Sequence, residues 1–257
     1  VKLLPNLSPE HEKNILGGEA TLWTEMVTED NIDLRIWPRT FAIAERFWSA
    51  KSTNNIDNMY QRLLTINDYA QTLGLKHQEQ YSSGIQGIVF PNTDISALLI
   101  LAQQLEPANY YTRHHLKFQK GLYHQNARLN DFVDYLPAES LKLVEMTQQL
   151  NSYKKGDVAG LKAIVNTLRD WHYNFEQAVA IIKKNPKLSP LVEVVVEARK
   201  INTLGLAIAQ SCLAGVKIRK AEAKRIKNTL NIIHSNVREI SLASGLFVEK
   251  MLEACRK

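Results

Sequence analysis

Cysteine is scarce in this chain, with Cys212 and Cys255 the two among 257 residues. A disulfide-stapled fold uses several cysteine pairs and a structural zinc site uses clustered thiols, so two widely separated cysteines favour neither. Both lie in apolar stretches of helical periodicity, where a small thiol packs like any other apolar side chain. We therefore expect both cysteines to be buried and reduced.

Long apolar runs are also absent. No run reaches the roughly 18 apolar residues of a membrane span, so we expect no membrane partner. The 11 glycines and 8 prolines are too few for a collagen-like or linker-like chain. Hydrophobic residues make up 45% and charged residues 23%, which is ordinary globular usage. The first residues carry no apolar stretch typical of a signal peptide, so the sequence assigns no compartment, and a periplasmic or extracellular location stays open.

Charge is unevenly distributed along the chain. Residues 1–77 carry 8 basic and 10 acidic side chains, whereas residues 78–257 carry 24 basic and 16 acidic ones. The densest basic cluster consists of Lys217, Arg219, Lys220, Lys224, Arg225 and Lys227. No aromatic side chains interleave with these charges, as they do in single-strand nucleic-acid sites. We interpret the cluster as a solvated helix face, with nucleic-acid binding as the weaker alternative.

The first 77 residues predict one strand followed by helices. Residues 15–23 (ILGGEATLW) are short and apolar, with a glycine pair that permits close approach, and so predict a buried strand. Pro38 suits the first position of a helix, and a second helix is expected over 57–73. The first helix has its apolar face at Phe41, Ala44, Phe47 and Trp48; the second has Met59, Leu63, Ile66, Tyr69 and Ala70.

The predicted strand has few candidate neighbours. A strand cannot satisfy its backbone hydrogen bonds alone, and residues 85–90 (IQGIVF) are the only other strand-like run. Residues 108–137 are rich in Tyr, His and Asn and read as irregular. Elsewhere, apolar residues at helical spacing predict helices that pack into a bundle. They are expected over 95–102, over 138–152, after an N-cap at Asp157, after Ser189-Pro190, and as one last helix from 226 to 255.

Two sequence blocks carry chemical information. They are ILGGEATLWTE, beginning at Ile15, and RIWPRTFAIAERFWS, beginning at Arg35. Together they resemble the last β-strand and last helix of the catalytic barrel of glycoside hydrolase family 20, the β-N-acetylhexosaminidases. The family pattern is roughly L-G-G-[EQ]-A-x-[LM]-W-[GT]-E, a short gap, then R-[LI]-W-P-R-x-x-A-x-[AG]-E-R-[LF]-W-S. Residues 105–113 and 129–140 resemble fragments of bacterial members.

The resemblance implies a (β/α)8 barrel whose chemistry lies at the C-terminal ends of its strands. By analogy with the family, Trp23 stacks on the terminal sugar ring. Glu25 accepts hydrogen bonds from the sugar hydroxyl at C4, with the hydroxyl at C6 as a second candidate. We expect ion pairs of Arg35, Arg39, Glu45 and Arg46 to hold the last helix on the barrel. Glu19 receives no substrate role.

The resemblance also implies substrate-assisted retaining hydrolysis, an exception to the two-carboxylate scheme. In the family, an Asp-Glu pair on an earlier strand orients the 2-acetamido group and protonates the leaving oxygen. No Asp-Glu dipeptide occurs in this sequence. We therefore expect no catalytic acid here, and no activity of this chain alone.

These observations predict a mainly α chain. Residues 1–77 are interpreted as the C-terminal remnant of the catalytic barrel and residues 78–257 as a helical C-terminal domain. The parent enzyme would act on N-acetylhexosaminide glycans without a cofactor. His114, His115 and His124 lack convincing metal-ligand spacing, so no metal is expected. The alternative is a helical protein-interaction, dimerisation or glycan-binding module, with a homodimer formed through the edge of strand 15–23.

Overall fold

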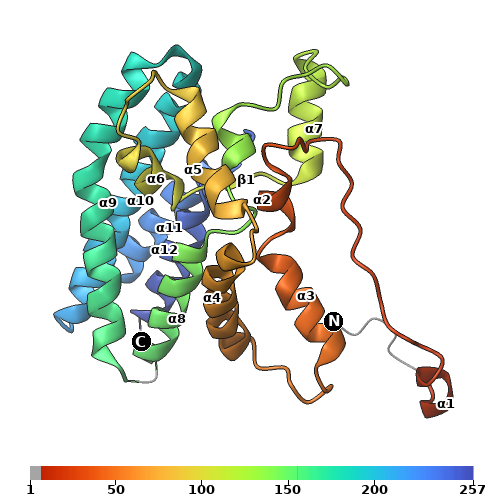
Figure 1. Ribbon diagram of the computed structural model, residues 1–257. Helices are drawn as coiled ribbons and strands as arrows, with labels where there is room; N and C mark the ends of the chain where they lie inside the picture. Colours follow the sequence, from red (N-terminus) through yellow and green to blue (C-terminus); the bar gives the residue numbers. More distant parts are fainter. Residues whose placement is uncertain (1–6, 155, 257) are drawn as a thin grey trace.

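Helices make up nearly all the regular structure of the computed structural model, which describes residues 7–154 and 156–256 (Figure 1). The mainly α class is therefore confirmed. In chain order, the elements are α1 (Pro9–Glu12), α2 (Ile32–Ile36), α3 (Arg39–Trp48), α4 (Ile56–Thr72), α5 (His77–Ile88), α6 (Ser96–Ala102), β1 (Glu106–Pro107), α7 (Tyr110–Gln119), η1 (Phe132–Tyr135), α8 (Leu141–Lys154), α9 (Val158–Lys184), η2 (Pro186–Leu188), α10 (Leu191–Leu213), α11 (Lys220–Ser235), β2 (Ile240–Ser241) and α12 (Ala243–Ala254).

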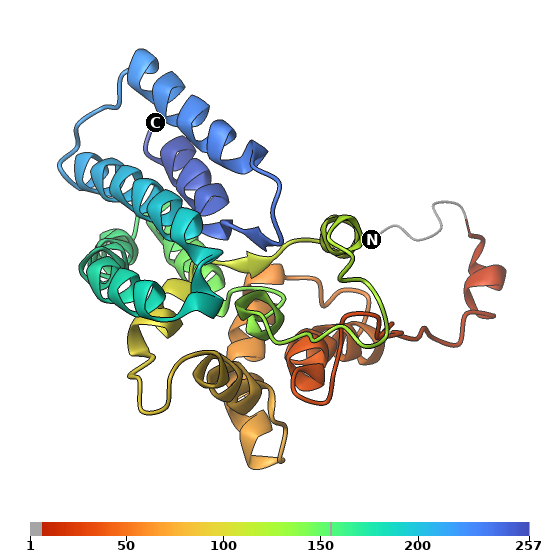
Figure 2. The same ribbon diagram turned by 90° about the horizontal axis from the view of Figure 1, so that it is seen from above.

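The longest helices, α9 and α10, form the centre of the core, and α6, α8 and α12 pack around them (Figure 2). The predicted cap at Asp157 is confirmed, since its side chain accepts a hydrogen bond from the amide of Ala159 at 2.9 Å. The apolar stripe of α9 includes the fully buried Trp171 and Phe175. Burying an apolar side chain of this size contributes about 2–3 kcal/mol, so the α9 stripe is a main source of stability.

Several side-chain hydrogen bonds inside this core fix the register of the helices. The indole N–H of Trp171 donates to Oε1 of Gln103 at 3.0 Å. The side-chain amide of Asn174 donates to the carbonyl of Ala97 at 2.7 Å, and that of Asn202 donates to the carbonyl of Leu168 at 2.9 Å. These bonds join α9 to α6 and to α10 in one arrangement, because a shifted helix would leave buried polar groups unpaired.

Several predicted elements differ from the structure. The single last helix is two helices, α11 and α12, because the intervening β2 pairs with β1 in an antiparallel ladder. Residues 85–90 are not a strand; they end α5, where Ile85, Ile88 and Val89 are buried at helical spacing. Residues 108–137, expected to be irregular, contain α7 and η1. The side chain of Ser189 makes no cap, and Pro190 occupies the N-cap of α10.

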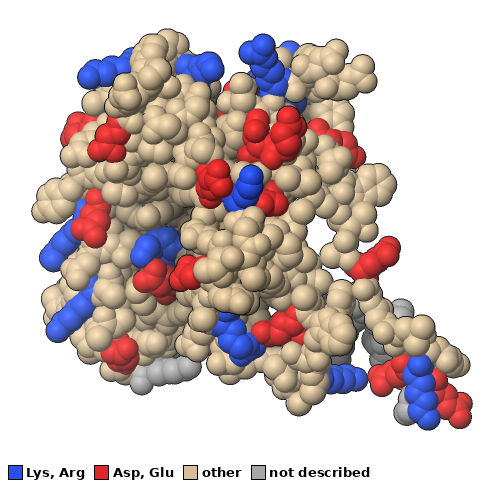
Figure 3. Space-filling view, viewed as in Figure 1, with Lys and Arg blue, Asp and Glu red and all other residues tan. Residues whose placement is uncertain are grey.

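The predicted buried strand is not formed. Residues 15–23, all of them described, run as an extended arm without strand pairing, and Leu16 is 99% exposed (Figure 1). In the space-filling view the arm stands away from the helical body along much of its length (Figure 3). The physical reason is the missing sheet: no other run in the described chain offers it a ladder of backbone partners.

Helix α3 shares this exposure. None of its ten described residues is buried, and Trp48 is 92% exposed, so the apolar face predicted from the sequence lies outside the core. The arm approaches this face where Gly18 lies against the ring of Phe47. The second predicted helix agrees better, since α4 buries Leu63 and Ala70. Thus many apolar side chains of the arm and of α3 are exposed.

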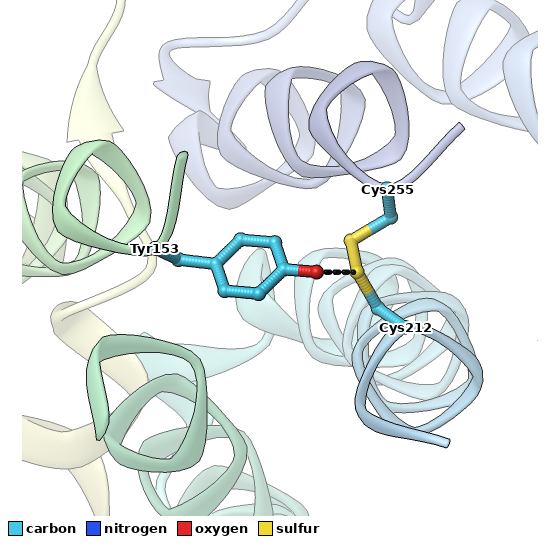
Figure 4. Close-up of a disulfide and its surroundings, with 3 residues drawn as sticks. All are labelled: Tyr153, Cys212 and Cys255. Atoms are coloured by element: carbon cyan, nitrogen blue, oxygen red, sulfur yellow. Dashed lines mark hydrogen bonds between the residues drawn. A yellow bond between two sulfur atoms is a disulfide. The ribbon is translucent and has the colours of Figure 1, made fainter. Parts of the chain in front are cut away.

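The expectation of reduced cysteines is wrong. Cys212, near the end of α10, forms a disulfide with Cys255 after α12, and the hydroxyl of Tyr153 lies 3.2 Å from Sγ of Cys212 (Figure 4). The disulfide could not be predicted from the sequence, because 43 positions separate the two cysteines. Packing of α10 on α12 brings their Cα atoms to 5.4 Å, which a disulfide spans.

We expect this disulfide to stabilise the fold. Replacing both cysteines (Cys212→Ser with Cys255→Ser) should lower the free energy of unfolding by about 2–4 kcal/mol, because the open chain gains conformational entropy when it unfolds. Urea denaturation with and without reductant measures the effect. Reductant should lower the stability of the wild type and leave the double variant unchanged. Equal stability of the wild type in both conditions would contradict the assignment.

Close packing of η1 on α5 gives a second prediction. A Cβ added at Gly84 would overlap the ring of Tyr135, whereas one at Gly87, one turn later in α5, would meet nothing within 4 Å. Gly84→Ala should therefore cost about 1–3 kcal/mol of unfolding free energy through overpacking. The matched Gly87→Ala should be neutral or stabilise by up to about 1 kcal/mol, since alanine favours helix. Thermal unfolding of both variants tests the difference, and equal melting temperatures would refute it.

Candidate functional site

The two sequence-predicted site residues, Trp23 and Glu25, lie two positions apart in the chain but have different surroundings. Trp23, at the end of the arm, is 76% exposed. Glu25 is also exposed, but it precedes the buried Met26, which anchors the following loop. Within that loop, the buried Asn31 accepts a hydrogen bond from the amide of Thr28 at 3.0 Å. Glu25 therefore projects from a fixed turn, whereas Trp23 projects from the free arm.

A pocket of about 340 Å3 lies beside this turn. Residues 24–28, including Glu25, line one side of it, and residues 122–129 after α7, together with Lys117, line the other. Trp23 is not among the lining residues. The structure thus brings Glu25 together with side chains that the sequence did not single out, and it does not bring Trp23 into the same pocket.

An aromatic cluster borders the pocket. Tyr123 lies with its ring 4.2 Å from that of His114, edge to face, and its hydroxyl is 2.9 Å from that of Tyr110. His114 also stacks parallel to Tyr110 at 5.7 Å. The hydrogen bond with Tyr123 raises the pKa of Tyr110 to about 12, with a smaller contribution from the charge of Glu25. Helical spacing of residues 110 and 114 was the available signal for this cluster.

Buried charged side chains of α7 form ion pairs next to the pocket. Lys117, which also lines the pocket, is almost fully buried, with its Nζ 3.3 Å from Oε2 of Glu239 and 3.6 Å from Oδ2 of Asp131. Arg113, one turn earlier in α7, donates to Oδ1 of Asp134 at 2.6 Å. The carboxylates thus balance both cations of α7 and hold the helix in one orientation.

Arg35 joins the N-terminal region to this network. Its guanidinium donates to the carbonyls of Asp134 at 2.6 Å and Leu136 at 3.0 Å. Burial, with the nearby charge of Arg113 as a lesser cause, lowers the pKa of Arg35 to about 10. On the adjacent α5, Oε1 of Gln80 accepts from the amide of Asp33 at 3.0 Å, which caps α2. The loop that carries Glu25 is therefore tied to the helical region.

The predicted ion pairs around α3 take a different form. Arg35, Arg39 and Arg46 donate to backbone carbonyls, because helix ends and turns offer unpaired acceptors there. Glu45 pairs with Arg62 of α4 at 2.6 Å. Glu19 is exposed on the arm. These contacts fix α3 to α4 and to its own loops.

Two further sequence expectations concern metals and polyanions. Among the described residues, no group of three or more His, Cys, Asp or Glu side chains is arranged to hold a metal ion. In the basic cluster, Lys227 pairs with Glu253 at 2.9 Å and lies 3.7 Å from Glu249.

No helix in the described part of the chain has the length and apolarity needed to cross a membrane.

Comparison with known proteins identifies the N-terminal region. Residues 2–51 match the family described as glycosyl hydrolase family 20, catalytic domain. The N-terminal region is therefore similar to a segment of a family 20 catalytic domain. Over 58 residues the chain is 48% identical to beta-hexosaminidase subunit A1 of Dictyostelium discoideum, covering 23% of this chain and 11% of that protein. It is 36% identical over 75 residues to subunit beta of Mus musculus, covering 29% and 14% respectively.

A structural comparison finds similarity that also covers the helical region. The X-ray structure of Flavobacterium johnsoniae chitobiase matches 96% of this chain with a TM-score of 0.78 and 23% sequence identity, and the match covers 36% of that protein. The helical region of this chain therefore shares its fold with part of a family 20 protein. The chain itself spans a small part of the length of these hexosaminidases.

The buried network at Asp134 yields a stability prediction. Asp134→Asn should lower the unfolding free energy by about 3 kcal/mol, because it removes the nearer of the two carboxylates that balance the buried Arg113 and leaves only Glu239, at 3.4 Å. The control is Glu176→Gln, which removes the exposed pair with Arg199 and should cost less than about 1 kcal/mol. Urea denaturation compares them. Equal small losses in both variants would show that the buried pair does not hold α7.

Proposed function

We propose that this chain forms the C-terminal part of a β-N-acetylhexosaminidase, an enzyme that removes terminal non-reducing N-acetylhexosamine residues by substrate-assisted retaining catalysis. Residues 1–77 would supply the last strand and helices of the catalytic barrel, and residues 78–257 a helical domain. The observation that carries the proposal is the match of residues 2–51, which include Trp23 and Glu25, to the family 20 catalytic domain. The 36–48% identity to hexosaminidase subunits over 56–75 residues supports it.

The exposed apolar surface supports this proposal. Leu16 and Trp23 on the arm and Trp48 on α3 are among the most exposed large hydrophobic side chains of the described chain, and Phe47 on α3 is about half exposed. Water-exposed apolar groups gathered in this way mark an interface. The occupant we propose is the remaining part of the catalytic barrel, whose strands would pair with residues 15–23 and cover α3.

In the completed barrel, Trp23 and Glu25 would lie at the C-terminal end of the last strand, where barrel enzymes bind their substrates. The indole face of Trp23 offers a broad apolar platform to the C–H groups of the terminal sugar. The carboxylate of Glu25 would accept hydrogen bonds from hydroxyls of the same sugar, and charge-assisted bonds of this kind are strong. The Asp-Glu pair that performs proton transfer would come from the rest of the domain.

The exposed arm also supports a second candidate, a dimerisation module. Unpaired extended backbone is a template for pairing with another copy of the same segment. Gel filtration of this chain tests this alternative directly. A dimer that dissociates when Leu16 is replaced by Lys would favour it, and a monomer at all concentrations would exclude strand-mediated pairing.

The hydrolase proposal is tested by activity toward a chromogenic N-acetylglucosaminide. The complete gene product should hydrolyse it, whereas residues 1–257 alone should not. Glu25→Gln in the complete protein should lower kcat/KM about 10- to 100-fold, the effect of losing a charge-assisted hydrogen bond.

Glu193→Gln is the control, because Glu193 is an exposed carboxylate on α10, outside the segment with family 20 similarity. It should leave kcat/KM within about twofold. Full activity of the Glu25→Gln variant would refute the role of Glu25, and absence of any N-acetylhexosaminidase activity in the complete protein would refute the function.

A further inference from the structure

A pocket of about 620 Å3 lies at the end of the helical region that contains the disulfide. Its walls come from the end of α8, from the turn after α10 and from the last turns of α12. The Cys212–Cys255 disulfide joins two of these walls, and the hydroxyl of Tyr153 from the third wall contacts it (Figure 4). The volume falls within the range of pockets that bind small molecules.

Three lysines, one from each wall, surround the pocket. Lys154 ends α8, Lys217 follows the turn after α10, and Lys250 lies on α12. Among the described residues that line the pocket, Glu253 is the one carboxylate. None of the three lysines forms an ion pair within the described part of the chain. The fold therefore brings three like charges to one pocket without giving them carboxylate partners.

The carboxylate of Glu253 is already paired with a cation from outside the lining. Its Oε1 lies 2.9 Å from Nζ of Lys227 on α11. The hydrogen bond with Lys227 lowers the pKa of Glu253, and the charges of Arg256 and Lys154 lower it further. The surroundings of Glu253 are thus positive on balance. A pocket lined by charges of one sign concentrates ions of the opposite sign.

The turn that carries Lys217 is fixed before any ligand arrives. Gly215 has a φ of 66°, the left-handed conformation that ends many helices, and its amide donates to the carbonyl of Cys212 at 3.1 Å. The amide of Val216 donates to the carbonyl of Ser211 at 2.9 Å. The disulfide then holds this end of α10 on α12. Walls that are preorganised in this way lower the entropic cost of binding.

We propose that this pocket binds a phosphate monoester, with the ammonium groups of Lys154, Lys217 and Lys250 around the phosphate. A phosphate monoester carries about 1.5 to 2 negative charges at neutral pH, which three cations balance. Lysine is a common phosphate ligand, because its ammonium group is a compact charge with three donors. The site is independent of the proposed hydrolase function, since its lining lies wholly outside residues 2–51.

Isothermal titration calorimetry of this chain with glucose 6-phosphate tests the site, and glucose is the matched uncharged ligand. Glucose 6-phosphate should bind, and glucose should not. Replacing two of the lysines (Lys217→Gln with Lys250→Gln) should raise Kd for glucose 6-phosphate at least about tenfold, because two charge-assisted contacts are lost. Added NaCl should also weaken binding, because salt screens the exposed ammonium groups.

Lys224→Gln is the matched control, because Lys224 is an exposed member of the basic cluster on α11 and does not line the pocket. It should leave Kd within about twofold. An equal loss in Lys224→Gln and in the double variant would assign binding to the whole basic cluster and overturn the pocket. Unchanged affinity in the double variant would also overturn it, as would no binding of glucose 6-phosphate by the wild type up to about 20 mM.

Inorganic phosphate distinguishes the ester from the free anion. Tighter binding of glucose 6-phosphate than of inorganic phosphate would support an ester as the ligand, whereas equal affinity would show that free phosphate suffices and overturn the assignment to an ester. Backbone amide NMR signals locate the site. Those of residues 215–217 should shift on titration with glucose 6-phosphate, and binding without shifts there would place the anion elsewhere and overturn the pocket.

Discussion

The carboxylate and backbone of Asp134 hold together three segments that are distant in the sequence. Its Oδ1 accepts from Arg113 of α7, its Oδ2 accepts from the amide of Asp131, and its carbonyl accepts from Arg35 of α2. All these groups except Asp131 are buried, so leaving any of them unpaired is costly. This arrangement sets α2, and hence the loop that carries Glu25, against α7.

The contacts of Asp134 help to explain why the loop from Glu25 onward is held in place whereas residues 15–23 are not. The loop from Glu25 onward is held by Met26, Asn31 and the cap from Gln80. Residues 15–23 have no comparable anchor beyond the contact of Gly18 with Phe47. The chain therefore presents a preformed pocket next to an exposed apolar arm. This is the arrangement expected of a part that is completed by further strands.

Local signals in the sequence predicted most helices, because caps such as Asp157 and stripes such as that of α9 depend on neighbouring residues. The family resemblance located Trp23 and Glu25, whose roles remain proposals. Long-range contacts were not predictable: the disulfide of Cys212 and Cys255 requires the packing of α10 on α12, and Tyr123 and Glu25 line one pocket only because the chain folds. The strand at 15–23 was predicted from its composition, but a strand forms only where partners exist.

The central claim is that residues 15–23 are a barrel strand that lacks its neighbours in this chain. Hydrogen–deuterium exchange of their backbone amides, in residues 1–257 alone and in the complete gene product, tests this claim most directly. We predict rapid exchange in the chain alone and protection by at least about a hundredfold in the complete protein, as for amides within a sheet. Equally rapid exchange of these amides in both proteins would contradict the account.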